Sequence, residues 1–199
     1  MTSSSVQTAG LSPLVRDAAG GVMPPWSRLG ERRLAHVRRV AGLMHDWAVA
    51  LRLSEADVVR WTAAGWLHDA LREADPEEMR AQVEPAFRTL PPKLLHGPAA
   101  AARLDGHADG ELREAIRFHT LGSPRWGTLG RALYLADFME PGRTWDPDYT
   151  AALRARMPGD MKHILAEVVR SRVDHIRSNG GVPHPETEAF HAQVVEAHP

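Results

Sequence analysis

The chain has 199 residues, no cysteine, and 24 basic against 25 acidic side chains, for a formal net charge of −1. This length is typical of one domain and allows about 70% of the unfolded surface to be buried without disulfides. The lack of cysteine excludes thiolate metal sites, iron–sulfur clusters and cysteine nucleophiles, so any metal site must use histidine nitrogen and carboxylate oxygen. The balanced charge argues against a broad nucleic-acid-binding surface.

The ends and the apolar runs of the chain bear on its location. No apolar run approaches the ~18 residues of a membrane span, and the first residues lack the basic and apolar regions of a secretory signal. We therefore expect a cytoplasmic protein without a membrane partner. Residues 1–27 are rich in Gly, Pro and Ser, which predicts a flexible N-terminal arm with one turn of helix near Leu14–Ala19.

From Arg28 onward the chain is charged, Ala-rich and periodic, without alternating Val/Ile/Thr runs. Apolar residues that recur every three or four positions indicate amphipathic helices, and the pattern predicts one all-α domain over residues 28–199. Caps, Pro and Gly delimit the expected helices, which are Leu29–Leu51, Ser54–Leu71, Pro76–Phe87, a short helix from Pro98 to Gly106, Asp109–Thr120, Thr128–Met139, Asp146–Met157, Asp160–Ser178 and a last helix after Pro185.

The dipeptide His68-Asp69 stands out because of its position on a helix. Val58, Trp61 and Gly65 define an inner stripe, His68 continues it by three residues, and Asp69 lies one step round. An Asp at the end of a buried stripe is costly unless it is paired or bound to a cation.

The same placement recurs along the chain. Apolar stripes lead to further His and Asp residues, or lie beside them, and one His directly precedes a helix start. The set predicted to face the interior of one bundle is His36, His68, Asp69, His96, His119 and Asp137. Imidazole and carboxylate suit iron, manganese, cobalt or zinc, and two such ions ~3.5–4 Å apart can polarise a phosphate and activate a water.

Each residue of this set also has a simpler interpretation, because a single inward His or a capping Asp is common. His45 provides the contrast, since nine residues after His36 it is turned ~180° around the helix and is expected at the surface. The remaining histidines are interpreted as structural or solvated: His107, His163, His175, His184, His191 and His198. The tryptophans are most simply packing residues, with base stacking by Trp126 or Trp145 as the alternative.

The order of these six residues resembles the HD-domain metal-dependent phosphohydrolases. The local sequence is closest to the bacterial YqeK-type family of symmetrical diadenosine-tetraphosphate hydrolases. The motifs that carry the resemblance are Arg33-x-x-His36, Ala64-Gly65-Trp66-Leu67-His68-Asp69, His96-Gly97, His119-Thr120-Leu121-Gly122 and Tyr134-Leu135-Ala136-Asp137 with Glu140-Pro141-Gly142-Arg143. The resemblance covers about residues 28–180.

The resemblance implies a helical bundle with a di-iron centre, manganese or cobalt being the other candidates. It implies that His36, His68, Asp69 and Asp137 hold one metal, that Asp69, His96 and His119 hold the other, and that a bridging hydroxide cleaves the tetraphosphate into two ADP. Asp69 and Arg72 are expected to be catalytic. Arg72, Gly97, Thr120 and Arg143 are expected to bind substrate. The family usually has Lys where this chain has Arg72, which keeps the positive charge but replaces a point charge with a planar fork.

Two alternatives remain at this point. The same chemistry could act on another nucleotide, such as a deoxynucleoside monophosphate or a cyclic dinucleotide. A non-catalytic nucleotide-binding helical module is the alternative from a different class, and metal content after purification without chelators would discriminate against it. The sequence leaves the oligomeric state open, including a homodimer.

Overall fold

The computed structural model describes residues 8 and 10–196. This part of the chain forms ten α-helices and two short 3-10 helices, without a β-strand, as the sequence pattern predicts. The α-helices are α2 (Pro13–Ala19), α3 (Glu31–Ala50), α4 (Glu55–Leu67), α5 (Pro76–Gln82), α6 (His96–Arg103), α7 (Gly110–Phe118), α8 (Thr128–Met139), α9 (Pro147–Arg156), α10 (Met161–Ser178) and α11 (Pro185–Glu196). None of the helices in the described ranges is both long and apolar enough to cross a bilayer.

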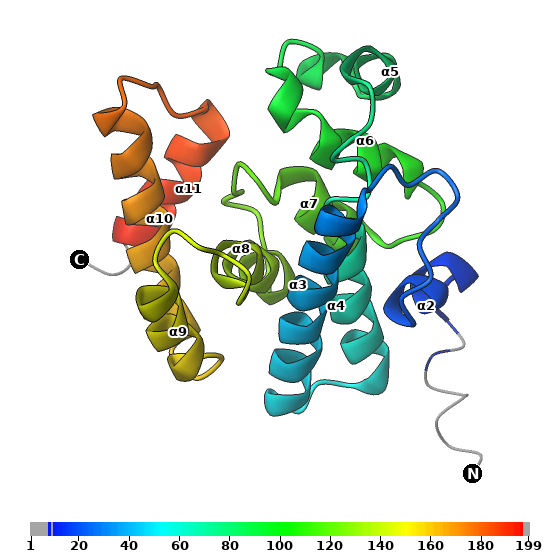
Figure 1. Ribbon diagram of the computed structural model, residues 1–199, viewed down its shortest axis with the longest axis horizontal. Helices are drawn as coiled ribbons and strands as arrows, with labels where there is room; N and C mark the ends of the chain where they lie inside the picture. Colours follow the sequence, from blue (N-terminus) through cyan, green and yellow to red (C-terminus); the bar gives the residue numbers. More distant parts are fainter. Residues whose placement is uncertain (1–7, 9, 197–199) are drawn as a thin grey trace.

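Helix α8 runs through the middle of the bundle (Figure 1). It contacts α3, α4 and α7 on one side and α9 and α10 on the other. Its residues explain this position, because Leu129, Leu133 and Ala136 on its inner stripe are fully or almost fully buried. A helix that is apolar almost all round belongs in the core of a bundle, so α8 is the element around which the others are arranged.

Helices α3 and α4 cross at short range at Gly65. A Cβ atom on Gly65 would lie 2.4 Å from the Cα and 2.7 Å from the backbone nitrogen of Ala41. The lack of a side chain at Gly65 therefore lets the two helix backbones approach each other. Because Gly65 lies one turn before His68, this approach also brings the end of α4 against the face of α3 that carries His36.

Helix α4 ends earlier than the sequence pattern indicates, at Leu67 rather than Leu71. The residues that follow make tight i to i+3 hydrogen bonds, such as Arg72 N–H to the Asp69 carbonyl. The backbone N–H of Arg28 donates to the Ala70 carbonyl, and the Arg28 carbonyl accepts from the N–H of Glu73. Backbone groups that a longer α4 would pair within the helix are thus paired with a distant segment. The expected helix Pro76–Phe87 is likewise divided, because Pro85 lacks an N–H and holds the preceding residue in an extended conformation.

The segment expected as a flexible arm is in part a packed helix. Helix α2 begins after the cap Ser12, and it packs against α4 with Val15 and Ala18 buried. The turn of helix that the sequence predicts near Leu14–Ala19 falls within this helix. Residues 1–7 and 9 of the expected arm lie outside the described residues.

Helix α11 fixes the loop that follows α7. Gly122 in this loop has a φ of +83°, and a Cβ there would lie 2.3 Å from the ring of Phe190. The Thr187 hydroxyl donates a 2.8 Å hydrogen bond to the Leu121 carbonyl. The loop between α7 and α8 is thus held by a helix more than sixty residues further along the chain.

The crossing at Gly65 predicts a stability difference between two glycines. Gly65→Ala should lower the free energy of unfolding of the metal-free protein by about 1–3 kcal/mol, because the added methyl forces the α3 and α4 backbones apart. This net loss is expected although Ala favours a helix over Gly by up to about 1 kcal/mol. Urea denaturation measures the change.

Gly42→Ala is the matched control for this prediction. Gly42 lies on α3, is exposed, and has no atom within 4 Å of the Cβ position. Its replacement should leave stability equal or raise it by about 0.4–1 kcal/mol. Equal effects of the two substitutions would show that the close crossing does not matter for stability.

Candidate active site

The six residues singled out in the sequence converge in the structure, and they do so at or near helix ends. His36 lies early in α3, His68 and Asp69 directly follow α4, His96 begins α6, His119 directly follows α7, and Asp137 lies in the last turn of α8. All but Asp137 are less than 6% exposed, and the Asp137 side chain is 15% exposed. Positions at or near helix ends let side chains from five segments meet at one place.

Four of these residues form two histidine pairs. The Nε2 atoms of His36 and His68 are 3.3 Å apart, and those of His96 and His119 are 3.0 Å apart. Asp69 lies between the pairs. Its Oδ2 atom is 3.6 Å from each Nε2 of His36 and His68. Its Oδ1 atom is 3.0 Å from Nε2 of His96 and 3.4 Å from Nε2 of His119.

Asp137 belongs to the His36 side of this arrangement. Its Oδ1 atom is 3.2 Å from Nε2 of His36 and 4.0 Å from Nε2 of His68. Within the described residues, two groups have ligand atoms close enough to share an ion: His36, His68 and Asp69, and Asp69, His96 and His119. Asp69 is common to both, and Asp137 stands beside the first.

The contacts of the Nδ1 atoms determine which ring nitrogen of each histidine faces the centre of the site. His68 donates from Nδ1 to the Gly65 carbonyl at 2.9 Å, and His119 donates from Nδ1 to the Ile116 carbonyl at 2.8 Å. The Nδ1 atom of His36 is 3.2 Å from Oε1 of Glu140. With Nδ1 acting as the donor in His68 and His119, the Nε2 atoms of these two rings present their lone pairs to the centre, which is the arrangement that orients histidine for a metal ion.

The donor set fits a pair of divalent cations. Two lone pairs about 3 Å apart repel each other unless a proton or a cation lies between them, and both pairs face a buried carboxylate. His96 is the exception in its outer contacts, because its buried Nδ1 has no hydrogen-bond partner among the described residues. Imidazole and carboxylate together suit iron, manganese, cobalt or zinc.

Burial and neighbouring charges shift the titration of these groups. Burial lowers the pKa of His68 to about 4 and also lowers the pKa of His96. Burial acts to raise the pKa of Asp69, but the neighbouring histidines outweigh it and hold this pKa well below its usual value. Burial acts in the same way on Asp137, and the contacts with His36 and Arg143 hold its pKa well below the usual range. At neutral pH the site thus presents ionised carboxylates beside neutral His68 and His96.

Glu140 and two arginines complete the charge balance, and sequence reasoning assigned no role to them. Burial would raise the pKa of Glu140, but hydrogen bonds with His36 and Arg39 lower it to about 2. Arg33 donates to Oδ2 of Asp69 at 2.7 Å. Arg33 and Glu140 both occur in the motifs that carry the family resemblance. Their partners lie 36 and 104 residues away, so the spacing of residues along the chain does not indicate these contacts.

The site opens into a cavity of about 580 Å³. Asp69, His96, His119 and Asp137 lie along its wall. The cationic side chains that line it are Arg33, Arg72, Lys93, Arg143 and Arg172. This excess of cations over the two aspartates suits a polyanionic ligand such as a phosphate chain.

The residues expected to bind substrate differ in their positions. Arg72, Thr120 and Arg143 line the cavity. Arg72 donates to the Lys93 carbonyl at 3.3 Å, and the Thr120 hydroxyl is 3.0 Å from Nε2 of His119. Gly97 does not line it, because it faces α7, where a Cβ would lie 2.8 Å from the Arg117 carbonyl.

Arg143 contacts the site directly. Its guanidinium donates to Oδ1 of Asp137 at 2.5 Å and to the Asp137 backbone carbonyl at 2.7 Å. It therefore joins the Asp137 carboxylate on the wall of the cavity. The sequence expectation for Arg143 is that it binds substrate.

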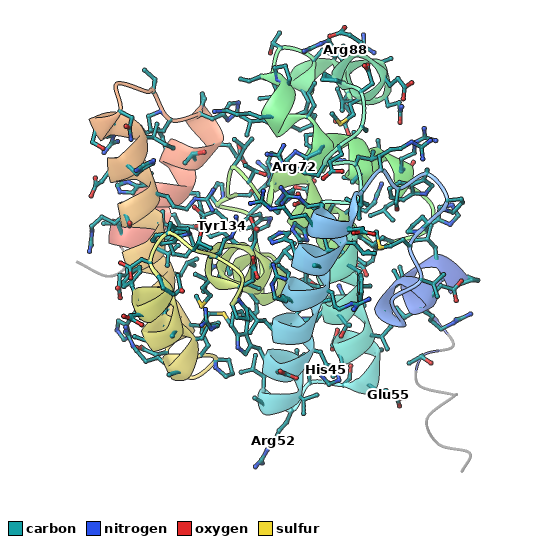
Figure 2. All side chains as sticks on the ribbon, viewed as in Figure 1. His45, Arg52, Glu55, Arg72, Arg88 and Tyr134 are labelled. Atoms are coloured by element: carbon teal, nitrogen blue, oxygen red, sulfur yellow. The ribbon has the colours of Figure 1, made fainter. Side chains whose placement is uncertain are left out.

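The structure also places His45 and the two tryptophans considered for base stacking. The His45 side chain is 51% exposed and contacts Asp46, and it lies toward the far end of α3 from Arg72 and Tyr134 (Figure 2). Trp126 is 5% exposed and packs against Tyr134 and Phe190, so it is a core residue rather than a base-stacking one. Trp145 is 52% exposed.

Comparisons with known proteins agree with this geometry. The HD domain family matches residues 33–169, which is more than half of the chain. Three curated relatives are described as symmetrical bis(5'-nucleosyl)-tetraphosphatases. The protein from Halalkalibacterium halodurans is 25% identical over 175 residues, covering 84% of this chain and 91% of that protein. Those from Staphylococcus aureus and Bacillus subtilis are 30% and 31% identical over 59% of this chain, and the matches span 63% and 66% of their lengths.

A solved structure supports the fold. The crystal structure of a protein from Clostridium acetobutylicum, described as a predicted HD superfamily hydrolase involved in NAD metabolism, superposes with a TM-score of 0.74. The two chains are 22% identical, and the superposition covers 92% of this chain and 96% of the other. The family match, the relatives and the converging histidines and aspartates lead to one conclusion: the chain belongs to the HD domain family and is a metal-dependent phosphohydrolase.

Proposed function

We propose that this phosphohydrolase cleaves a dinucleoside tetraphosphate, diadenosine tetraphosphate above all, at its central bridge. One water is added across the central P–O–P linkage, and two nucleoside diphosphates are released. The observation that carries the proposal is the position of Asp69. Its two oxygens face two histidine pairs at the wall of a cavity lined by five cationic side chains.

The residues that would hold the metal ions divide around Asp69. His36, His68, Asp69 and Asp137 would bind one ion, and Asp69, His96 and His119 the other. Divalent ions bound there would supply Lewis acidity at a phosphate oxygen and a water that ionises near neutral pH. We propose iron as the resident metal, with manganese or cobalt able to replace it.

The chain's own side chains would place the substrate. Arg143 and Arg72 lie on the cavity wall, where a guanidinium can hold two phosphate oxygens at once. The Thr120 hydroxyl lies 3.0 Å from Nε2 of His119. It is therefore placed to donate a hydrogen bond to a phosphate oxygen that binds next to His119. Arg33 is bonded to Asp69 and so fixes the orientation of the shared carboxylate. These contacts act on the phosphate chain and leave the nucleosides to other parts of the cavity.

The shared carboxylate predicts unequal losses of metal. Wild type should bind about two transition-metal ions per chain. His119→Ala should lose about one ion, whereas Asp69→Asn should lose both, because it removes the negative charge that faces both groups and halves the number of donor oxygens. Asp69→Asn should also lower activity by ~10³-fold or more. Elemental analysis after reconstitution measures the content.

His45→Ala is the control for the metal prediction, because His45 is exposed and far from the cluster. It should keep both ions and full activity. Two retained ions in Asp69→Asn, or less than half an ion in wild type, would exclude the shared-carboxylate site.

The proposed reaction predicts a single nucleotide product. Diadenosine tetraphosphate incubated with wild-type protein loaded with Fe, Mn, Co or Mg should give ADP alone, resolved by anion-exchange chromatography. Equal amounts of AMP and ATP would show asymmetrical cleavage and contradict the proposal. Hydrolysis of a deoxynucleoside monophosphate or a cyclic dinucleotide in preference to the tetraphosphate would show that the enzyme applies the same chemistry to another substrate.

The position of Arg143 predicts that its loss weakens the handling of substrate but leaves the metal content unchanged. Arg143→Ala should lower kcat/KM by about 10- to 100-fold, the scale of losing one charge-assisted hydrogen bond of about 1.5–3 kcal/mol. Metal content should not change, because Asp137 keeps its contact with His36. Wild-type kinetics in Arg143→Ala would remove Arg143 from the substrate site, and a parallel loss of metal would make it a supporter of Asp137 instead.

A further inference from the structure

A second cavity adjoins the one that holds the histidines. It has a volume of about 420 Å³, and its wall is formed by α8, α10 and the loop before α9. The residues that line it are Phe138, Trp145, Ser171, Arg172, His175 and Ile176. Arg172 and Ile176 also line the catalytic cavity, so the two cavities share one wall.

Aromatic rings dominate this second cavity. The rings of Phe138 and Trp145 lie 4.9 Å apart with an angle of 64° between them. Trp145 is 52% exposed, and it is the one aromatic residue among the exposed large apolar residues of the described chain. An indole held by a neighbouring ring but open to solvent is suited to stack on a planar heterocycle, and it loses little rotamer freedom in doing so.

Arg172 connects the two cavities. Its guanidinium carbon lies 4.7 Å from the centre of the Tyr134 ring and 6.0 Å from that of Phe138. Its Nη2 donates to the carbonyl of Thr120 at 3.4 Å, and Thr120 is itself next to His119. A cation at the shared wall is placed to hold a phosphate as the polyphosphate chain passes from one cavity to the other.

We propose that the second cavity binds one nucleoside of the substrate, with its base stacked on Trp145. This inference rests on the proposed function, since only a substrate with two nucleosides needs a second base site. The cationic catalytic cavity would take the phosphate chain, Arg172 would hold the chain where it leaves, and Phe138 with Trp145 would receive the base. Another cavity that Trp145 lines fits a base less well, because Trp145 is the only Trp, Tyr or Phe among the described residues of its wall and its Arg39 and Glu140 already bind each other.

The test compares two ligands that share the tetraphosphate but differ in the number of nucleosides. Trp145→Ala should lower kcat/KM for diadenosine tetraphosphate by about 10-fold, which corresponds to about 1.4 kcal/mol of lost stacking. The inhibition constant of adenosine 5'-tetraphosphate, with one nucleoside, should change by less than 2-fold. Trp145→Phe should retain most of the activity because it keeps a ring in place.

Val49→Ala is the control, because Val49 is equally exposed at 52% and lies on α3, outside the residues that line either cavity. It should change neither constant. Equal effects of Trp145→Ala on both ligands would mean that Trp145 supports the loop between α8 and α9 that carries Arg143. No effect on either ligand would mean that the base binds elsewhere. Both results would overturn the second site.

The outcomes of this test are separate from those of the proposed function. A wild-type protein that releases ADP while Trp145→Ala is unaffected would refute only the second site. A wild-type protein that releases no ADP would refute the proposed reaction. In that case diadenosine tetraphosphate is titrated as a ligand, and an unchanged affinity in Trp145→Ala would refute the second site as well.

Discussion

The structure depends on the burial of the Asp69 carboxylate. A buried and isolated carboxylate is too costly to remain ionised, so its charge must be balanced by neighbours. In this chain Arg33 forms an ion pair with one oxygen, and the imidazoles of His96 and His119 lie within 3.4 Å of the other. Arg33 lies on α3, His96 begins α6 and His119 directly follows α7, so keeping Asp69 ionised requires several segments to be in place together. The geometry of the phosphohydrolase site is therefore also a condition on the packing of the bundle.

The packing meets this condition through close approaches of the backbone. Gly65 brings α4 onto α3, and Gly97 brings α6 onto the carbonyl groups at the end of α7. Each contact lies one to three residues from a histidine of the site. The carbonyls of Gly65 and Ile116 then orient the His68 and His119 rings. Backbone atoms, which side-chain substitution changes least, thus set the direction of two of the four imidazoles.

Sequence reasoning could predict the helical fold, the single domain and the residues that converge, because apolar periodicity marks the inner face of each helix. The bounds of α8 were predicted correctly at Thr128–Met139, where the Pro141-Gly142 pair follows the end of the apolar stripe. The end of α4 was wrong, because hydrogen bonds between Arg28 and the Ala70–Glu73 turn depend on a segment forty residues away. The pairing of Glu140 with His36, 104 residues apart, lay beyond any local pattern for the same reason.

The contacts of α11 with the loop after α7 have a consequence for the order of events during synthesis. The family match ends at residue 169, so the Thr187 and Phe190 contacts come from a helix outside the matched region. A ribosome releases the chain from its N-terminus onward, at about 5–20 residues per second. The segment that carries His119 therefore leaves the ribosome several seconds before the helix that restrains it. The nascent chain can collapse around α3, α4 and α8 during this interval, but the loop next to His119 gains its final support only when α11 arrives.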